Sequence, residues 1–118
     1  LLFVFFQKGI SIMLENKFKT KLISELKIIF PGCIIMHADP TEIQGIPDLI
    51  VLYNDTWFAL EGKKCQNSPH RPNQDYYVKL MNRMSFASFI CPENKKEVLD
   101  EIQRSLKTKR PTRIYECE

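Results

Sequence analysis

The first long pattern in the chain is helical. Between Leu14 and Phe30 apolar residues recur at helical spacing while lysines fall on the opposite side, which predicts an amphipathic helix. The pair Pro31-Gly32 is typical of a helix end, and the apolar run from Cys33 to Met36 then predicts a short first strand.

The middle of the chain follows a strand pattern. The stretches PDLIVLY (Pro47 to Tyr53) and TWFALEGK (Thr56 to Lys63) are separated by Asn54-Asp55, which predicts two strands joined as a hairpin. From Lys64 to Asn73 the sequence is polar, contains two prolines and has no periodicity. We expect a loop there, of the kind that often carries binding contacts.

The last third returns to mixed elements. Gln74 to Met84 predicts a helix, Phe86 to Cys91 a compact strand, and Glu93 to Lys107, introduced by Pro92, a final amphipathic helix. Thr108 to Glu118 is expected to be a tail or an added edge strand. The predicted order is therefore α-β-β-β-α-β-α, without an internal repeat.

Length and composition fit one globular domain. With 118 residues, of which 44% are hydrophobic and 26% charged, the chain can build one core and does not resemble a disordered or fibrous protein. The net charge of +3 is compatible with a polyanionic partner but too small to establish one. Because Met13 opens the helical pattern, residues 1–12 are expected to be an N-terminal extension of a single domain over residues 13–118.

The compartment is inferred from the N-terminal run and the cysteines. Leu1 to Phe6 is too short to span a bilayer and lacks a basic leader, so no membrane association is expected, and an edge strand is the alternative for this run. The four cysteines are scattered without a C-x-x-C pair, which predicts reduced thiols in a cytoplasmic protein. A zinc site would need Cys65 and His70 to meet a third ligand.

The hairpin register brings charged residues together. With Asn54-Asp55 as a two-residue turn, Asp48 faces Glu61, and alternation places Lys63 on the same side. Two carboxylates about 5 Å apart repel by roughly 3 kcal/mol at an effective dielectric near 20, and a divalent cation such as Mg²⁺ would remove that repulsion. The alternative is a hairpin slipped by one residue, which leaves Asp48 capping a turn and Glu61 paired with Lys63 on a solvated face.

The same residues carry a resemblance. GIPDLIVL (Gly45 to Leu52) and WFALEGKK (Trp57 to Lys64) resemble the PD-(D/E)XK nuclease superfamily, in particular the small VRR-NUC-like nucleases common in phages and the Holliday junction resolvases. Pro47-Asp48 matches the PD element and Glu61-Gly62-Lys63 the (D/E)XK element, and Gln74 resembles the glutamine that opens the next helix in many members. The resemblance implies a restriction-endonuclease-like α/β core, a mixed four-stranded sheet flanked by helices.

The resemblance also implies a function. The chain is expected to be a Mg²⁺-dependent endonuclease that hydrolyses phosphodiester bonds in DNA, with Mn²⁺ able to replace Mg²⁺. Asp48 and Glu61 would hold the metal with help from the Gly62 carbonyl, and Lys63 would stabilise the attacking hydroxide and the phosphoryl charge. Gln74 would orient a water or a phosphate in the catalytic set, or it only caps its helix.

Three positions need separate comment. Glu25 is the candidate for the further acid that superfamily members often carry on the first helix, and a surface salt bridge with Lys21 is its alternative. VRR-NUC-like proteins usually have a basic residue before the GxPD element, where the nearest residue here is His37. Gly62 stands where a β-branched residue is usual.

Contacts with nucleic acid are expected near the polar loop and the helix after it. The candidates are Lys64, His70, Arg71, Lys79 and Arg83. For each of them the alternative is an ordinary solvated surface residue without a binding role. The expected substrate is DNA, branched or flapped by resemblance, with RNA an open alternative and a homodimer an option for the active unit. The competing hypotheses are an inactive nucleic-acid-binding protein of the same fold and a domain without a nucleic-acid role.

Overall fold

The elements follow the predicted order. The computed structural model describes residues 2–107, and its elements within that range are α1 (Leu2–Ile29), β1 (Ile34–His37), β2 (Leu49–Tyr53), β3 (Thr56–Gly62), α2 (Gln74–Met84), β4 (Phe86–Ile90) and α3 (Lys95–Lys107). The order α-β-β-β-α-β-α is confirmed, and most bounds agree with the predicted ones to within two residues. The predicted tail at Thr108 to Glu118 lies outside the described residues.

The strands form one mixed sheet in the order β1-β2-β3-β4. β1, β2 and β3 pair antiparallel, and β4 joins β3 in parallel after the crossover that carries α2. Tyr53 pairs with Thr56 and Leu52 with Trp57, and Asn54 at the turn has φ 53°, as tight hairpin turns require. The predicted hairpin and its register are confirmed, and the slipped alternative is wrong.

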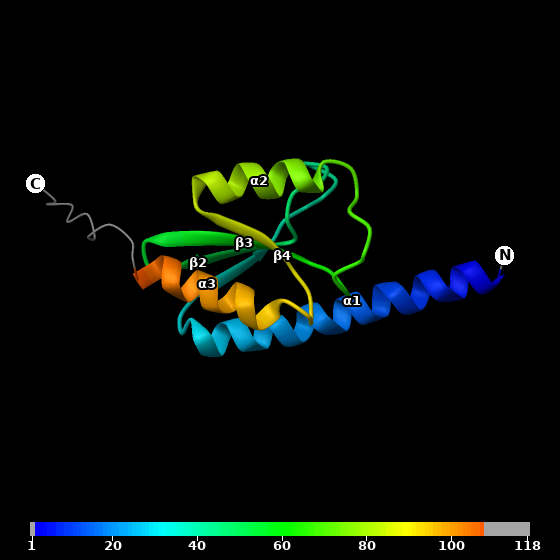
Figure 1. Ribbon diagram of the computed structural model, residues 1–118, viewed down its shortest axis with the longest axis horizontal. Coiled ribbons are helices and arrows are strands. Elements are labelled where there is room, and N and C mark those ends of the chain that lie inside the picture. Colours follow the sequence, from blue (N-terminus) through cyan, green and yellow to red (C-terminus); the bar gives the residue numbers. More distant parts are fainter. Residues whose placement is uncertain (1, 108–118) are drawn as a thin grey trace, which may run out of the picture.

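Helices cover both faces of the sheet (Figure 1). On one face α1 and α3 pack over the strands in a core that includes Leu22, Leu26, Phe58, Leu60 and Ile102. On the other face α2 forms a smaller core with the sheet, built from Ala59, Val78, Met81 and Ala87. The chain is therefore an α/β fold with a mixed four-stranded sheet between helices, as predicted.

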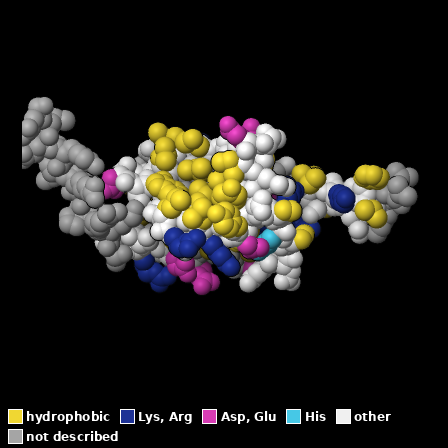
Figure 2. All heavy atoms as spheres, turned by 90° about the horizontal axis from the view of Figure 1, so that it is seen from above, with side chains coloured by type: hydrophobic (Ala, Val, Ile, Leu, Met, Phe, Trp, Pro, Cys, Tyr) yellow, Lys and Arg dark blue, Asp and Glu magenta, His cyan; other side chains and the backbone are white. Residues whose placement is uncertain are grey.

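One part of the sheet has no covering helix among the described residues. The register places Ile34, Met36 and Leu52 on the α2 side, where they are 60%, 49% and 38% exposed. Figure 2 shows hydrophobic side chains gathered over the middle of the face seen from that side. α2 packs against β3 and β4, so the half of the face over β1 and β2 stays open.

The first helix is longer than predicted. It begins at Leu2 and runs without a break through Met13, so an edge strand for the first residues is wrong over the part that the structure describes. Its N-terminal half projects beyond the body of the molecule (Figure 1), where Phe5 and Phe6 are each 67% exposed. The apolar residues near the N-terminus do not alternate with polar ones as a half-buried strand would require, and they continue the helix instead. No helix in residues 2–107 is long and apolar enough to cross a membrane.

Candidate active site

The hairpin places two carboxylates side by side. The hydrogen-bonded ladder between β2 and β3 ends at Leu49 and Leu60, so Asp48 and Glu61 are the next pair in register, and each carboxyl group shifts the pKa of the other. The backbone N–H of Ala38 donates to the Asp48 carbonyl at 2.9 Å, which continues the pairing of β1 with β2 past the end of the strand. Asp48 is thereby held between two strands.

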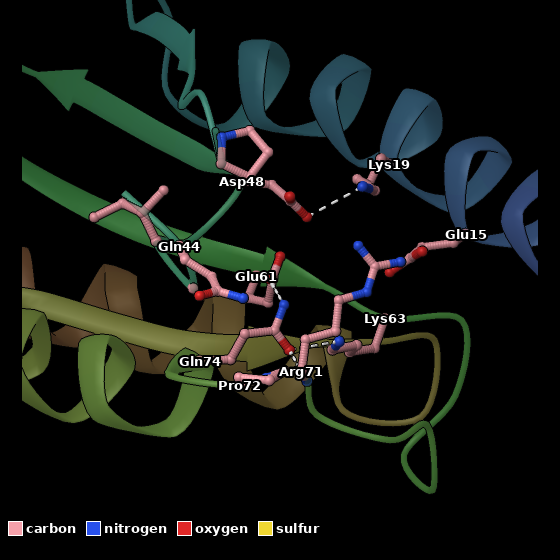
Figure 3. A pocket seen from close by; sticks show the side chains of 12 residues that line it. Glu15, Lys19, Gln44, Asp48, Glu61, Lys63, Arg71, Pro72 and Gln74 are labelled. Atoms are coloured by element: carbon pink, nitrogen blue, oxygen red, sulfur yellow. Dashed lines mark hydrogen bonds and ion pairs between the residues drawn. The ribbon is translucent and has the colours of Figure 1, made fainter. Parts of the chain in front are cut away.

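These residues line a pocket of about 290 Å³ (Figure 3). Of the predicted site, Asp48, Glu61, Lys63 and Gln74 all lie in its wall, and the predicted DNA contact Arg71 joins them. The structure adds polar residues that sequence reasoning missed, namely Glu15, Lys19 and Gln44. The pocket opens where the ends of β2 and β3 meet α1, the start of α2 and two loops.

Gly45 of the GIPD motif lets those two loops meet. It has φ +92°, a conformation that favours glycine, and a Cβ there would lie 2.6 Å from the Asn73 carbonyl carbon and 2.8 Å from the Pro72 carbonyl oxygen. The loop before β2 therefore packs directly on the loop before α2. Because Gly45 and Pro72 both line the pocket, this close contact forms part of its wall.

Gln74 connects Glu61 with Lys63. Its Nε2 donates to Glu61 Oε1, while its Oε1 accepts from the Lys63 ammonium at 2.8 Å and from the Arg71 backbone N–H at 2.8 Å. Lys63 also donates to the Pro69 carbonyl at 3.3 Å. An ammonium can only donate, so it must face the amide oxygen, which turns the NH₂ toward Glu61. Gln74 thus orients the Glu61 and Lys63 side chains, whereas the sequence predicted that it orients a water or a phosphate or only caps its helix.

Glu61 is the buried member of the carboxyl pair. It is 3% exposed, and burial, the hydrogen bond with Asp48 and the Asp48 charge raise its pKa to about 9, although Lys63 and Lys19 act in the opposite direction. Its Oε2 is buried and receives no hydrogen bond within residues 2–107. An ionised Glu61 would leave that oxygen unsatisfied, and its raised pKa favours the protonated form in the absence of a cation.

Asp48 is the ionised member. Burial tends to raise its pKa, but the hydrogen bond with Glu61, the charge and hydrogen bond of Lys19, and the N–H of Gly62 together lower it. Lys19 comes from α1, and its Nζ lies 3.1 Å from Asp48 Oδ2 (Figure 3). In this state the pair therefore holds a single negative charge, balanced by Lys19.

Gly62 makes room for Lys19. A Cβ at Gly62 would lie 2.7 Å from Lys19 Cγ and 3.1 Å from Cδ, closer than side chains approach one another. Glycine at this position thus allows the lysine stem to cross β3 on its way to Asp48. A signal for Lys19 was present in the sequence, because Glu15, Lys19, Leu22 and Leu26 share one helical face.

Gly62→Ala tests this packing. The added methyl should displace the Lys19 stem and lower the free energy of unfolding by about 1–3 kcal/mol, the usual effect of overpacking. In a Lys19→Ala background Cγ is gone, and the same change should cost nothing or stabilise the strand slightly. Chemical denaturation of the four proteins of this cycle measures both values. Gly9→Ala, where nothing lies within 4 Å of the added methyl, is the control and should not destabilise. An equal loss in both backgrounds would show that Lys19 is not the obstacle.

The structure does not bring Glu25 to this pocket. Its Oε1 pairs with Lys95 Nζ at 2.9 Å, which ties α1 to α3, and the expected alternative partner Lys21 is not the one it uses. The acid of α1 that lines the pocket is Glu15. Glu25 lies more than two turns farther along the helix, so the metal-ligand prediction named the wrong glutamate for this pocket.

The structure places the predicted nucleic-acid contacts in three settings. Lys64 and Arg71 line a smaller hollow of about 130 Å³ that shares Glu15, Lys63 and Arg71 with the main pocket. His70 instead stacks on Phe89, with ring centroids 3.9 Å apart, and its Nδ1 lies 2.8 Å from Asp75 Oδ1. The remaining basic candidates are exposed and line neither hollow: Lys79, Arg83 and, at the end of β1, His37.

Residues 2–107 contain no group of three or more His, Cys, Asp or Glu side chains able to hold a metal ion. The zinc alternative is thereby unsupported, since Cys65 Sγ contacts Ser68 Oγ and His70 pairs with Asp75. Two carboxylates remain, which is few for Ca²⁺ or Zn²⁺ but usual for Mg²⁺, an ion that keeps waters and takes further oxygens from substrate phosphates.

Comparison with family models, with curated proteins and with solved structures finds no match to this chain.

Proposed function

We propose that this protein is a Mg²⁺-dependent endonuclease of the PD-(D/E)XK type that hydrolyses phosphodiester bonds in DNA. The observation that supports this best is the pair Asp48 and Glu61, which line one pocket and shift each other's pKa, with Glu61 Oε2 buried and given no donor by residues 2–107. Folding alone does not favour two acids at one point in a sheet. A cation-binding site would explain why both acids are present.

The residues present fit a divalent metal. Asp48 and Glu61 would hold it, with the Gly62 carbonyl as a third oxygen donor, and their oxygens are the hard ligands that Mg²⁺ prefers. When bound, the ion supplies charge for the phosphoryl oxygens and lowers the pKa of a water. A cation in place of the Glu61 proton would give Oε2 a partner and offset the repulsion between two ionised carboxylates.

Lys63 is the residue that we assign to charge stabilisation during the reaction. It is 6% exposed and fixed by Gln74 Oε1 and the Pro69 carbonyl. An ammonium has three N–H groups, so one remains for a phosphoryl oxygen or the attacking hydroxide. A cation that is held in place before the substrate arrives needs little reorganisation, and this makes its electrostatic effect large.

Substrate would enter past the loop that precedes α2. Arg71 lines both hollows and Lys64 the smaller one, so we assign these two residues to the phosphates that flank the cleaved bond. Contacts of this kind fix the position of the strand without reading its sequence. The family resemblance supports a branched or flapped DNA as the substrate.

The proposal is tested by incubating the protein with single-stranded, duplex, flap and four-way DNA in the presence of Mg²⁺ or Mn²⁺, and with the matching RNAs. Metal-dependent cleavage of at least one DNA is expected, with no cleavage in EDTA. Binding of DNA without cleavage under any condition would favour the inactive nucleic-acid-binding protein. The absence of both binding and cleavage would refute a nucleic-acid role.

Arg71→Ala, compared with Arg83→Ala, tests the entry path. Both arginines are exposed, but Arg71 lines the two hollows and Arg83 neither. Loss of one phosphate contact should weaken DNA binding in EDTA roughly three- to tenfold and reduce the slope of log affinity against log salt by about one. Fluorescence anisotropy over a salt series measures both quantities. Equal effects of the two substitutions would mean that the strand does not pass Arg71.

A further inference from the structure

The two lysines of the pocket are held in different ways. Lys63 is bound by neutral acceptors, the Gln74 amide oxygen and the Pro69 carbonyl. Lys19 is bound by Asp48 itself, at 3.1 Å, and both side chains are partly buried, 23% and 31% exposed. Only Lys19 therefore occupies an oxygen that the proposed metal would need.

This contact is built into the fold. Lys19 is carried by the part of α1 that packs over the sheet, and its stem crosses β3 at the one strand position that has no Cβ, Gly62. Figure 3 shows its ammonium pointing from α1 into the pocket toward Asp48. A lysine that served only as a surface ion pair would need no such passage.

A second carboxylate lies one helical turn away. Glu15 precedes Lys19 by four residues on α1 and lines the same pocket. A glutamate four residues before a lysine is the favourable order for an ion pair on a helix. Glu15 is therefore an alternative ion-pair partner that the Lys19 ammonium could reach by a side-chain rotation if it left Asp48.

From these contacts we infer that Lys19 is a built-in competitor of the divalent cation: it neutralises Asp48 while the metal is absent and moves toward Glu15 when the metal binds. This inference rests on the proposed metal site. The ammonium and a metal ion repel each other at the Asp48 carboxylate, so a metal ion that binds Oδ2 has to displace the ammonium from it. Lys19 is a positioning residue that keeps the empty site assembled at the expense of metal affinity.

The test is Mn²⁺ titration by calorimetry, without DNA, of the whole protein and its variants. Lys19→Met should bind Mn²⁺ more tightly, by on the order of tenfold, because an ion pair and a repulsion are removed. Lys19→Arg keeps the competing charge and should stay near the parent value. Lys17→Met, an exposed lysine of the same helix outside the pocket, is the matched control and should change nothing.

Glu15→Gln is a second test of the displacement of Lys19. Without its waiting partner the displaced ammonium is less stable, so Mn²⁺ should bind a few fold more weakly, and this effect should vanish in Lys19→Met. A glutamate that only attracted the metal directly would keep its effect in both backgrounds, which would refute the displacement. Circular dichroism of each variant confirms that it is folded before titration.

The two proposals can fail separately. If the parent binds Mn²⁺ and Lys19→Met binds it equally or more weakly, Lys19 is not a competitor, and the proposed nuclease site stands. If the parent shows no Mn²⁺ binding at millimolar concentration, the metal site itself is wrong and this inference falls with it.

Discussion

Lys63→Ala is expected to lower the single-turnover rate of DNA cleavage by roughly a hundredfold or more, the scale seen when one preorganised electrostatic group is removed. Mn²⁺ and DNA affinity should remain within a few fold of the parent. The reason for this difference is that the ammonium meets negative charge that develops mainly in the transition state. Rapid mixing with excess enzyme separates the chemical step from binding and product release.

The structure strengthens this expectation by showing how Lys63 is held. Its backbone N–H donates to the Ile90 carbonyl at 2.8 Å, which extends the pairing of β3 with β4 and sets the direction of the side chain. Gln74 then fixes the ammonium. Because the backbone and the ammonium of Lys63 are both held before the reaction, little conformational entropy has to be lost when negative charge develops in the transition state.

Controls distinguish this role from a structural one. Lys79→Ala removes an exposed lysine of α2 that lines neither hollow, and its cleavage rate should match that of the parent. Lys63→Arg restores a charge with a different shape and should recover only part of the rate. If Lys63→Ala cleaved as fast as the parent with saturating metal, the assignment of Lys63 to the transition state would be wrong.

The centre of the site could be predicted because it depends on one hairpin. Asn54-Asp55 sets the turn, and a slip by one residue would move Leu49 and Val51 out of the core, so only one register buries the right side chains. Once that register is known, Asp48 has to face Glu61. Turn chemistry and side-chain alternation alone left the slipped hairpin open, and the resemblance of the two motifs favoured the register that the structure has.

The surroundings of the pair depend on contacts between distant elements. The helical pattern of α1 shows that Glu15, Lys19, Leu22 and Leu26 share a face, but it does not show which turn passes the ends of β2 and β3. Glu25 lies at the border of the apolar face, between Leu22 and Ile29, and this position made it the candidate acid. It is close instead to α3, where Lys95 is its partner.

The N-terminal half of α1 was missed for a related reason. Its apolar residues, such as Phe5 and Ile12, have no core to face, so the sequence there lacks the two-sided pattern by which amphipathic helices are recognised. The helix nevertheless continues upstream from its packed half, since extending a formed helix costs far less than starting one.

Glu61→Gln should remove the pH dependence that Glu61 imposes on stability. The folded-state pKa of Glu61, about 9, is far above its ordinary value of 4.5, so the folded protein holds a proton that the unfolded chain releases. The stability associated with that proton is fully present below pH 4.5 and is lost as the pH rises toward 9. The loss reaches at most about 1.4 kcal/mol per pH unit. Asp48, whose pKa is lowered below 3.8, titrates outside this window.

Glutamine keeps the shape, can accept the Gln74 hydrogen bond and can donate to Asp48 at every pH. Without metal, Glu61→Gln should therefore gain stability over the parent steadily from pH 5 to 9, as measured by denaturant unfolding. Mn²⁺ should stabilise the parent at pH 8 and leave Glu61→Gln and Asp48→Asn unchanged, because each has lost a charged ligand. Glu25→Gln, which removes a carboxylate bound to Lys95, should not show a gap that widens with pH. If the free energies of unfolding of the parent and Glu61→Gln changed in parallel with pH, Glu61 would be ionised in the folded protein. This result would contradict a protonated Glu61 at the proposed cation site.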